Sequence, residues 1–157
     1  TRIARLTDLP RSLKELNLIF CQEVPVEEFE MLDERFFHLE VLILRNTKIA
    51  KLIGLPKGLK FLDLSSCNRL ASGQFEALNE SFSHLEMLIL INSEITKLGC
   101  LPKSLKSLDL SFCQNIISQE LEQLRAFKKL QAIYLPYAFK DDPIVQSLKL
   151  IKSKIFI

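Results

Sequence analysis

The feature that most constrains this chain is a block of 46 residues that recurs in register along most of its length. One segment occurs three times, as LPRSLKELNL at 9–18, LPKGLKFLDL at 55–64 and LPKSLKSLDL at 101–110. Another occurs twice, as HLEVLILRNTKI at 38–49 and HLEMLILINSEI at 84–95. A fixed period of this kind is typical of repeat architectures, in which each unit packs on its neighbours. The sequence therefore predicts an extended repeat array.

Each block divides into two unequal units. The pattern L-x-x-L-x-L begins at six leucines, at steps of 26, 20, 26, 20 and 25 residues: Leu13, Leu39, Leu59, Leu85, Leu105 and Leu130. Spacing of two within the pattern predicts a strand in every unit. In the long units, the wider spacing of Phe75, Leu78 and Phe82 predicts a helix on the return side. The short units leave too few residues for a full helix, so we expect an extended or 3₁₀ return there.

These units resemble the leucine-rich repeat family, whose pattern is L-x-x-L-x-L-x-x-N/C-x-L. The resemblance covers nearly the whole chain and implies an α/β horseshoe with a parallel β-sheet on its concave face. The long units, with Cys67 in the ladder, resemble the cysteine-containing repeats of F-box adaptors. The short L-P units resemble repeats of secreted bacterial effectors, and also the N-T-x-I units of plant intracellular immune receptors.

The repeat pattern changes at both ends of the chain. After Leu135 it stops, and Asp141-Asp142-Pro143 predicts the start of a helix with proline in its first turn. An apolar stripe follows at Ile144, Val145, Leu148 and Ile151. We expect residues 1–139 to form the array and residues 140–157 to form a C-terminal helical cap. Residues 1–6 align with 47–52, in the middle of a unit, so we expect a fragment of a longer protein.

Bulk composition limits the class of protein without identifying it. The 157 residues are 48% hydrophobic, which is enough for one domain with a sizeable core. A formal net charge of +2 favours no class of partner. No apolar run reaches the roughly 18 to 20 residues of a membrane helix, so we expect no membrane insertion. We predict a cytoplasmic protein, in the host cytosol if it is a secreted effector.

Three of the four cysteines recur at one position of the long units, as Cys21, Cys67 and Cys113. Neighbouring strands lie ~4.8 Å apart, so alternate coils lie ~10 Å apart. That distance exceeds the roughly 7 Å limit between the Cα atoms of a disulfide, and it prevents two of these thiolates from sharing a zinc ion. We interpret them as buried structural thiols, which favours a reducing compartment and predicts no metal site.

No motif predicts an enzyme. His38 and His84 are repeat equivalents, so architecture accounts for their recurrence. The sequence has no G-x-x-x-x-G-K, G-x-G-x-x-G, H-E-x-x-H or C-x-x-C motif. Asp141 and Asp142 could be paired catalytic carboxylates, but their place before Pro143 favours helix capping. We predict no catalytic residue, no cofactor and no small-molecule substrate.

Residues between the ladder leucines are expected to point out of the concave face, because side chains of a strand alternate between faces. The predicted partner-binding residues are Val41, Ile43, Arg45, Phe61, Asp63, Met87, Ile89, Ile91, Asp109 and Tyr134. Most of them are apolar, and large apolar patches typically mark interaction sites. Two alternatives stay open: these residues satisfy strand propensity, or another segment of the full protein covers them.

A second candidate surface is basic. Three rows of cations recur with the repeat: Arg5, Lys51 and Lys97; Arg11, Lys57 and Lys103; Lys14, Lys60 and Lys106. Rows of one sign attract acidic proteins, lipid headgroups or nucleic acid. The return segments are rich in glutamate, however, and no aromatic residues alternate with the lysines as single-strand binding requires. We therefore do not expect nucleic-acid binding.

The leading functional hypothesis is a protein interaction module that recognises another protein through its concave sheet. Ile43, Ile89, Phe61 and Tyr134 would be apolar anchors, with Asp63 and Asp109 setting orientation. The family resemblance suggests a bacterial effector acting on host proteins, or the substrate-recognition arm of a ubiquitin ligase. The alternatives are the noncatalytic repeat portion of a larger enzyme or immune-type sensor, and a structural spacer.

Overall fold

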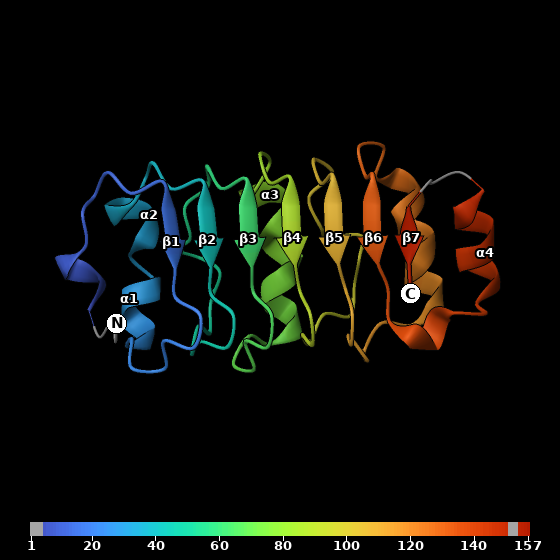
Figure 1. Ribbon diagram of the computed structural model, residues 1–157, viewed down its shortest axis with the longest axis horizontal. Helices are drawn as coiled ribbons and strands as arrows, with labels where there is room; N and C mark the ends of the chain where they lie inside the picture. The colour runs from blue at the N-terminus through green and yellow to red at the C-terminus, as the bar shows by residue number, and fades with distance from the viewer. Residues whose placement is uncertain (1–4, 151–153) are drawn as a thin grey trace.

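A computed structural model describes residues 5–150 and 154–157, and its strands form one parallel sheet. The strand order follows the chain without interruption. The strands are β1 (Glu15–Asn17), β2 (Val41–Ile43), β3 (Phe61–Asp63), β4 (Met87–Ile89), β5 (Ser107–Asp109), β6 (Ala132–Tyr134) and β7 (Ile155–Phe156). Figure 1 shows them side by side along the longest axis, with helical segments behind the sheet and at its two ends. The sheet is open, and the molecule is the α/β solenoid that the repeat predicts.

The ladder leucines build the core behind this sheet. The central residue of each unit strand is at most 5% exposed: Leu16, Leu42, Leu62, Leu88, Leu108 and Ile133. Pairing between neighbouring strands joins equivalent positions, as in Leu16 with Leu42 and Leu42 with Leu62. Five buried phenylalanines fill the wider space inside the long units: Phe29, Phe36, Phe75, Phe82 and Phe127. Each buried side chain of this size stabilises the fold by roughly 1.5 to 3 kcal/mol.

The return sides of the two kinds of unit differ as predicted. Helical segments occur in the long units: α1 (Val26–Phe29) and α2 (Leu32–Arg35), η2 (Ser72–Ala77) and α3 (Leu78–Ser81), and η3 (Ser118–Ala126). In the short units, the described residues between β2 and β3, and between β4 and β5, contain no helix. Much of the return is 3₁₀ rather than α. A 3₁₀ helix rises ~2.0 Å per residue against ~1.5 Å, so it covers the long unit with fewer residues.

A repeated hydrogen bond, which the sequence analysis does not predict, joins the return helix of each long unit to the preceding short unit. A side-chain oxygen accepts from a backbone N–H in three places: Glu28 from Leu6 at 2.8 Å, Gln74 from Leu52 at 3.2 Å and Glu120 from Leu98 at 2.8 Å. The acceptors stand 46 residues apart, as do the donors. The recurrence of Glu28, Gln74 and Glu120 at the 46-residue period is the sequence signal from which this bond could have been predicted. Coils are therefore joined on their return side as well as through the sheet.

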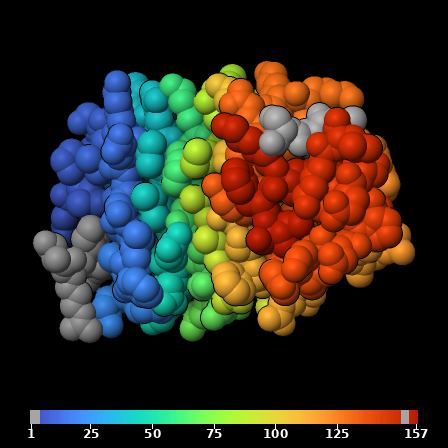
Figure 2. Space-filling view, turned by 45° about the vertical axis from the view of Figure 1, so that its right-hand side comes forward, coloured from blue at the N-terminus to red at the C-terminus, as the bar shows by residue number. Residues whose placement is uncertain are grey.

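The C-terminal segment begins with η4 (Tyr137–Phe139) and the predicted helix, α4 (Pro143–Lys149). Asp142 is its N-cap: one carboxylate oxygen accepts from the Ile144 backbone N–H at 2.8 Å, and Ser118 Oγ donates to the other at 2.6 Å. The capping interpretation is confirmed for Asp142. Val145 and Leu148 are buried, as the apolar stripe predicts, whereas Ile151 lies outside the described residues. In Figure 2 the C-terminal residues cover the forward end of the array.

The helical cap was only part of the C-terminal structure, because the chain then returns to the sheet. Ile155 pairs with Ile133, and Phe156 with Tyr134, so β7 adds a strand beyond the last repeat unit. Its two residues are too few for the L-x-x-L-x-L pattern, which explains why the sequence did not predict it. At the other end, η1 (Leu6–Asp8) places Leu6 in the core. The predicted start within a repeat falls partly on residues 1–4, outside the described residues.

Candidate functional site

The face of the sheet that points away from the core, called the open face below, carries three rows of side chains. The first row, at the amino ends of the strands, is Glu15, Val41, Phe61, Met87, Ser107 and Ala132, with Lys154 beside Ala132 just before β7. The second is Asn17, Ile43, Asp63, Ile89, Asp109, Tyr134 and Phe156. The third, just beyond the strands, is Ile19, Arg45, Ser65, Ile91 and Ser111. The open face is turned toward the viewer in Figure 1, where the return helices of the long units lie behind the sheet.

All ten predicted partner-binding residues lie on the open face. Met87 and Tyr134 are the most accessible of them, at 37% and 40% exposed. Most of the others are partly buried by their neighbours within the rows. Asp63 differs most from the expectation, because it is only 3% exposed. The structure thus brings the predicted residues together, while their role in binding stays a prediction.

A groove of about 500 Å³ crosses the first row. Its floor is formed by Phe61, Met87, Ser107 and Ala132. Its rim is polar and consists of Lys60, Glu86, Lys106, Gln131 and Lys154. Apolar side chains bordered by polar groups are also found at protein interfaces, where the apolar core of the interface adjoins a polar rim.

Four of the nine cations in the predicted basic rows are paired with acids. Four lysines form ion pairs with glutamates of the preceding coil: Lys51 with Glu30 at 3.0 Å, Lys60 with Glu40 at 2.7 Å, Lys97 with Glu76 at 2.7 Å and Lys106 with Glu86 at 2.8 Å. The Lys60 ammonium lowers the pKa of the Glu40 carboxyl, and Lys106 lowers the pKa of Glu86. Such exposed pairs contribute little stability. They do make this surface one of mixed charge rather than a basic stripe.

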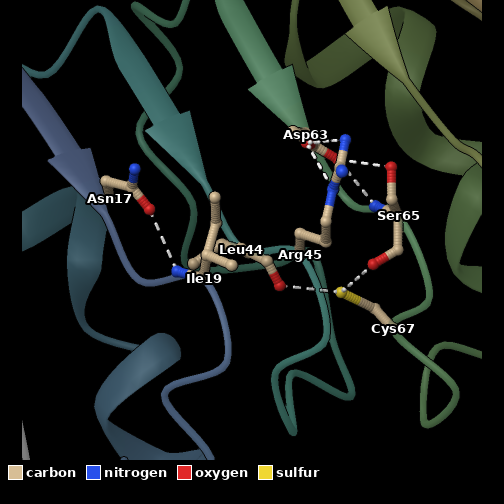
Figure 3. A network of polar contacts seen from close by, with 7 residues as sticks. All are labelled: Asn17, Ile19, Leu44, Arg45, Asp63, Ser65 and Cys67. Atoms are coloured by element: carbon tan, nitrogen blue, oxygen red, sulfur yellow. Dashed lines mark hydrogen bonds and ion pairs between the residues drawn. The ribbon is translucent and has the colours of Figure 1, made fainter. Parts of the chain in front are cut away.

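Asp63 is buried because neighbouring polar groups surround its carboxylate (Figure 3). Arg45, from the preceding coil, contacts Oδ2 through Nη2 at 3.1 Å and Nε at 3.2 Å. Ser65 donates to Oδ1 from its backbone N–H at 2.9 Å and from Oγ at 2.5 Å. These bonds offset the desolvation of the charge. Arg45 and Asp63 therefore engage each other, and neither side chain is presented alone.

The turn that follows the strand is the same in all three long units. Asn17 Oδ1 accepts from the Ile19 N–H at 3.0 Å (Figure 3), and Asp109 Oδ1 accepts from the Ser111 N–H at 2.9 Å. Both bonds reproduce that between Asp63 and Ser65. Side chains of Asn and Asp commonly bond to the backbone two residues ahead in this way. The acidic positions of the second row thus have a local structural role besides any role in recognition.

Three residues beyond the end of each strand from β1 to β5, in long and short units alike, a residue other than glycine enters the left-handed region. These are Phe20, Asn46, Ser66, Asn92 and Phe112, with φ between 54° and 62°. The N–H of each of the first four donates to a carbonyl of the next coil at 2.9 or 3.0 Å. A phenylalanine with positive φ is uncommon. Phe20 and Phe112 are nonetheless 64% and 70% exposed, so packing of their rings is not the reason for this conformation.

The ladder cysteines have the predicted structural role in two of three places. Cys67 Sγ donates to the Leu44 carbonyl at 3.1 Å (Figure 3), and Cys113 Sγ donates to the Leu90 carbonyl at 3.0 Å. Burial raises the pKa of both thiols. Cys21 is only partly buried, contrary to the expectation, because no described strand precedes β1 to supply an equivalent carbonyl. All four cysteines are free.

Other chemistry-bearing groups do not gather at this face. His38 and His84 are exposed at equivalent places just before β2 and β4. Within residues 5–150 and 154–157, no three His, Cys, Asp or Glu side chains lie close enough to hold a metal ion. In the same part of the chain, every helix is too short or too polar to cross a bilayer.

Comparisons with known proteins add no further assignment. No protein-family model matches the chain, and a search of curated proteins finds no match. The resemblances to F-box adaptors and to bacterial effectors stay predictions from the repeat pattern. The open face is the strongest candidate site on structural grounds.

Proposed function

We propose that this protein is a binding module that recognises another protein through the open face of its sheet. The observation that carries the proposal is the groove over the first row, where Met87 is exposed on the floor and Tyr134 is exposed in the neighbouring second row. Apolar side chains of this size, gathered on one surface, are typical of interaction sites. Aromatic residues and methionine are also enriched at the cores of protein interfaces.

The repeat architecture supports this use because it fixes the binding side chains before the partner arrives. Each open-face residue lies beside a buried ladder residue whose packing holds the strand in place. A surface that is ordered in advance loses less conformational entropy on binding. We infer that an extended partner segment lies across the strands, with apolar side chains against Phe61 and Met87. The charged rim then sets its orientation.

The subfamily resemblances suggest two settings for such a module. Short L-P units resemble effector repeats, which suggests a host protein as partner. Cysteine-containing units resemble those of F-box adaptors, which suggests a substrate of a ubiquitin ligase. Both settings need the same property from this chain, which is specific recognition of a protein by a rigid sheet.

The test is peptide selection on variants with a charge added to one face. Short random peptides displayed on phage are selected on the wild-type protein, and the affinities of the selected peptides are measured by calorimetry. Met87→Glu places a carboxylate on the groove floor and should weaken binding by at least about tenfold. The matched control is Ile53→Glu, since Ile53 is 78% exposed in the return part of a short unit. Equal binding to both variants would move the site away from the open face.

A further inference from the structure

Asp63 and Asp109 occupy the same position in successive long units, 46 residues apart. The backbone around them is bonded in the same way: Leu44 N–H donates to the Asp63 carbonyl and Leu90 N–H to the Asp109 carbonyl, both at 2.8 Å. The agreement continues two residues further along the chain. There the Asn46 N–H donates to the Ser65 carbonyl and the Asn92 N–H donates to the Ser111 carbonyl, both at 2.9 Å. The two carboxylates therefore stand on matching frameworks, and any difference between them comes from their neighbours.

The neighbour that differs is the third-row residue of the preceding coil. Beside Asp63 it is Arg45, whose guanidinium contacts Oδ2 through two nitrogens. Beside Asp109 it is Ile91, which can donate no hydrogen bond. Oδ1 of Asp109 accepts from the Ser111 N–H, and Oδ2 has no partner among residues 5–150 and 154–157. Asp109 is also more accessible than Asp63, being partly rather than fully buried.

An aromatic ring lies on the other side of Asp109. Tyr134 is its partner in the register of β5 and β6, so the two residues are neighbours at about the strand spacing of ~4.8 Å. The Tyr134 ring stacks on Phe156, with centroids 4.6 Å apart and planes 17° apart. Phe156 belongs to β7, on the far side from β5, so it covers the ring face that points away from Asp109. The opposite face of the Tyr134 ring is on the side of the Asp109 carboxylate.

We propose that Asp109 and Tyr134 form a subsite for the side chain of an arginine in the partner that docks on the open face. This inference rests on the proposed function. A guanidinium can pair with a carboxylate through two nitrogens and stack on an aromatic face, whereas an ammonium provides a point charge. The protein already makes the first contact internally, between Arg45 and Asp63. At Asp109 the equivalent neighbour, Ile91, carries no charge, so the arginine of the partner supplies the cation.

Two variants test the subsite from opposite directions. Ile91→Arg should restore the internal pair at Asp109 and fill the subsite from within, which also raises the melting temperature. Asp109→Asn removes the charge but keeps the turn, because Asn17 makes the same turn in the first long unit. The control is Ile53→Arg, which adds the same charge in the return part of a short unit. Circular dichroism establishes that each variant is folded.

The measurement is again selection from the displayed peptide library. Peptides selected on the wild type and on Ile53→Arg should share an arginine, and replacing that arginine with lysine should weaken binding about tenfold. The enrichment should vanish on Ile91→Arg and on Asp109→Asn. Peptides that depend on Met87 but carry no common arginine and bind Asp109→Asn as tightly would overturn the subsite and leave the proposed function standing. Failure to select any Met87-dependent peptide would overturn both.

Discussion

The buried and open faces of the sheet alternate along the same strands, yet only the buried face keeps one kind of residue from each coil to the next. Leu42, Leu62, Leu88 and Leu108 follow one another in the core, each fully buried. On the open face, the second row contains amide, carboxylate, aliphatic and aromatic side chains. Close packing restricts what the core accepts, whereas solvent does not restrict the open face in this way. Variation against a constant framework is therefore the best guide to where this molecule is specialised.

The largest expected effect comes from the buried face. Leu64→Ala removes a fully buried ladder side chain and should lower the free energy of unfolding by about 2 to 5 kcal/mol. Each coil packs mainly on its neighbours, so the cavity weakens contacts on both sides. Urea denaturation followed by circular dichroism measures the loss. A loss below about 1 kcal/mol would mean that the ladder is not the main source of stability.

The next effect concerns a place where one coil departs from the backbone of its equivalent. Gly54 has φ +115°, and a Cβ there would lie 2.3 Å from the Glu30 carbonyl oxygen. Gly54→Ala should therefore destabilise the protein by about 1 to 3 kcal/mol. Gly73→Ala is the matched control, because its Cβ would meet no atom within 4 Å. Thermal unfolding of the two variants should separate them clearly, and equal melting temperatures would contradict the close contact.

A smaller effect tests the exception on the open face, where a charge is buried. Arg45→Met leaves the Asp63 carboxylate without its cation. Because the Arg45 side chain is 41% exposed, solvent screens the pair and the loss should be about 1 to 2 kcal/mol. In an Asp63→Asn background the same substitution should have little effect. A double-mutant cycle from urea denaturation measures the coupling, and additive losses would show that the two side chains act independently.

The buried thiols make stability depend on pH by a still smaller amount. Their pKa is raised in the folded protein, so the unfolded chain loses these protons first and stability falls as the pH rises through the ordinary thiol pKa of ~8.5. At that pH each thiol should lower the free energy of unfolding by about 0.4 kcal/mol. Unfolding of the wild type and of Cys67→Ala/Cys113→Ala at pH 7 and 8.5 isolates this contribution. The same pH dependence in both proteins would exclude it.

The smallest effect on stability is expected where the effect on binding is largest. Met87 is partly exposed, and its neighbours in the first row are Phe61 and Ser107 rather than acids. Met87→Glu should change the free energy of unfolding by no more than about 0.5 kcal/mol. Urea denaturation beside Leu64→Ala gives the comparison directly. A loss as large as that of Leu64→Ala would mean that the two faces of the sheet are not distinct in the way described.

Much of the fold could be predicted because its causes lie within one repeat. The strand positions and the inward direction of residues such as Leu62 follow from spacing of two within a period of 46. The burial of Asp63 could not be predicted in this way, because Arg45 comes from another coil and has no equivalent 46 residues later. The strand β7 was missed for a related reason: Ile155 and Phe156 pair by position at the sheet edge and carry no repeat pattern.

The sequential order of the strands also governs how the protein reaches its structure. Paired residues are close in the chain, since Glu15 pairs with Val41, 26 residues on, and Val41 pairs with Phe61, 20 residues on. The pairing of neighbouring strands does not require the two ends of the molecule to meet, so the entropy cost of loop closure is similar at every junction. Folding can then nucleate at any pair of coils and spread in both directions. By the same argument, opening begins at β1 and β7, and the centre of the open face is the last part to lose its order.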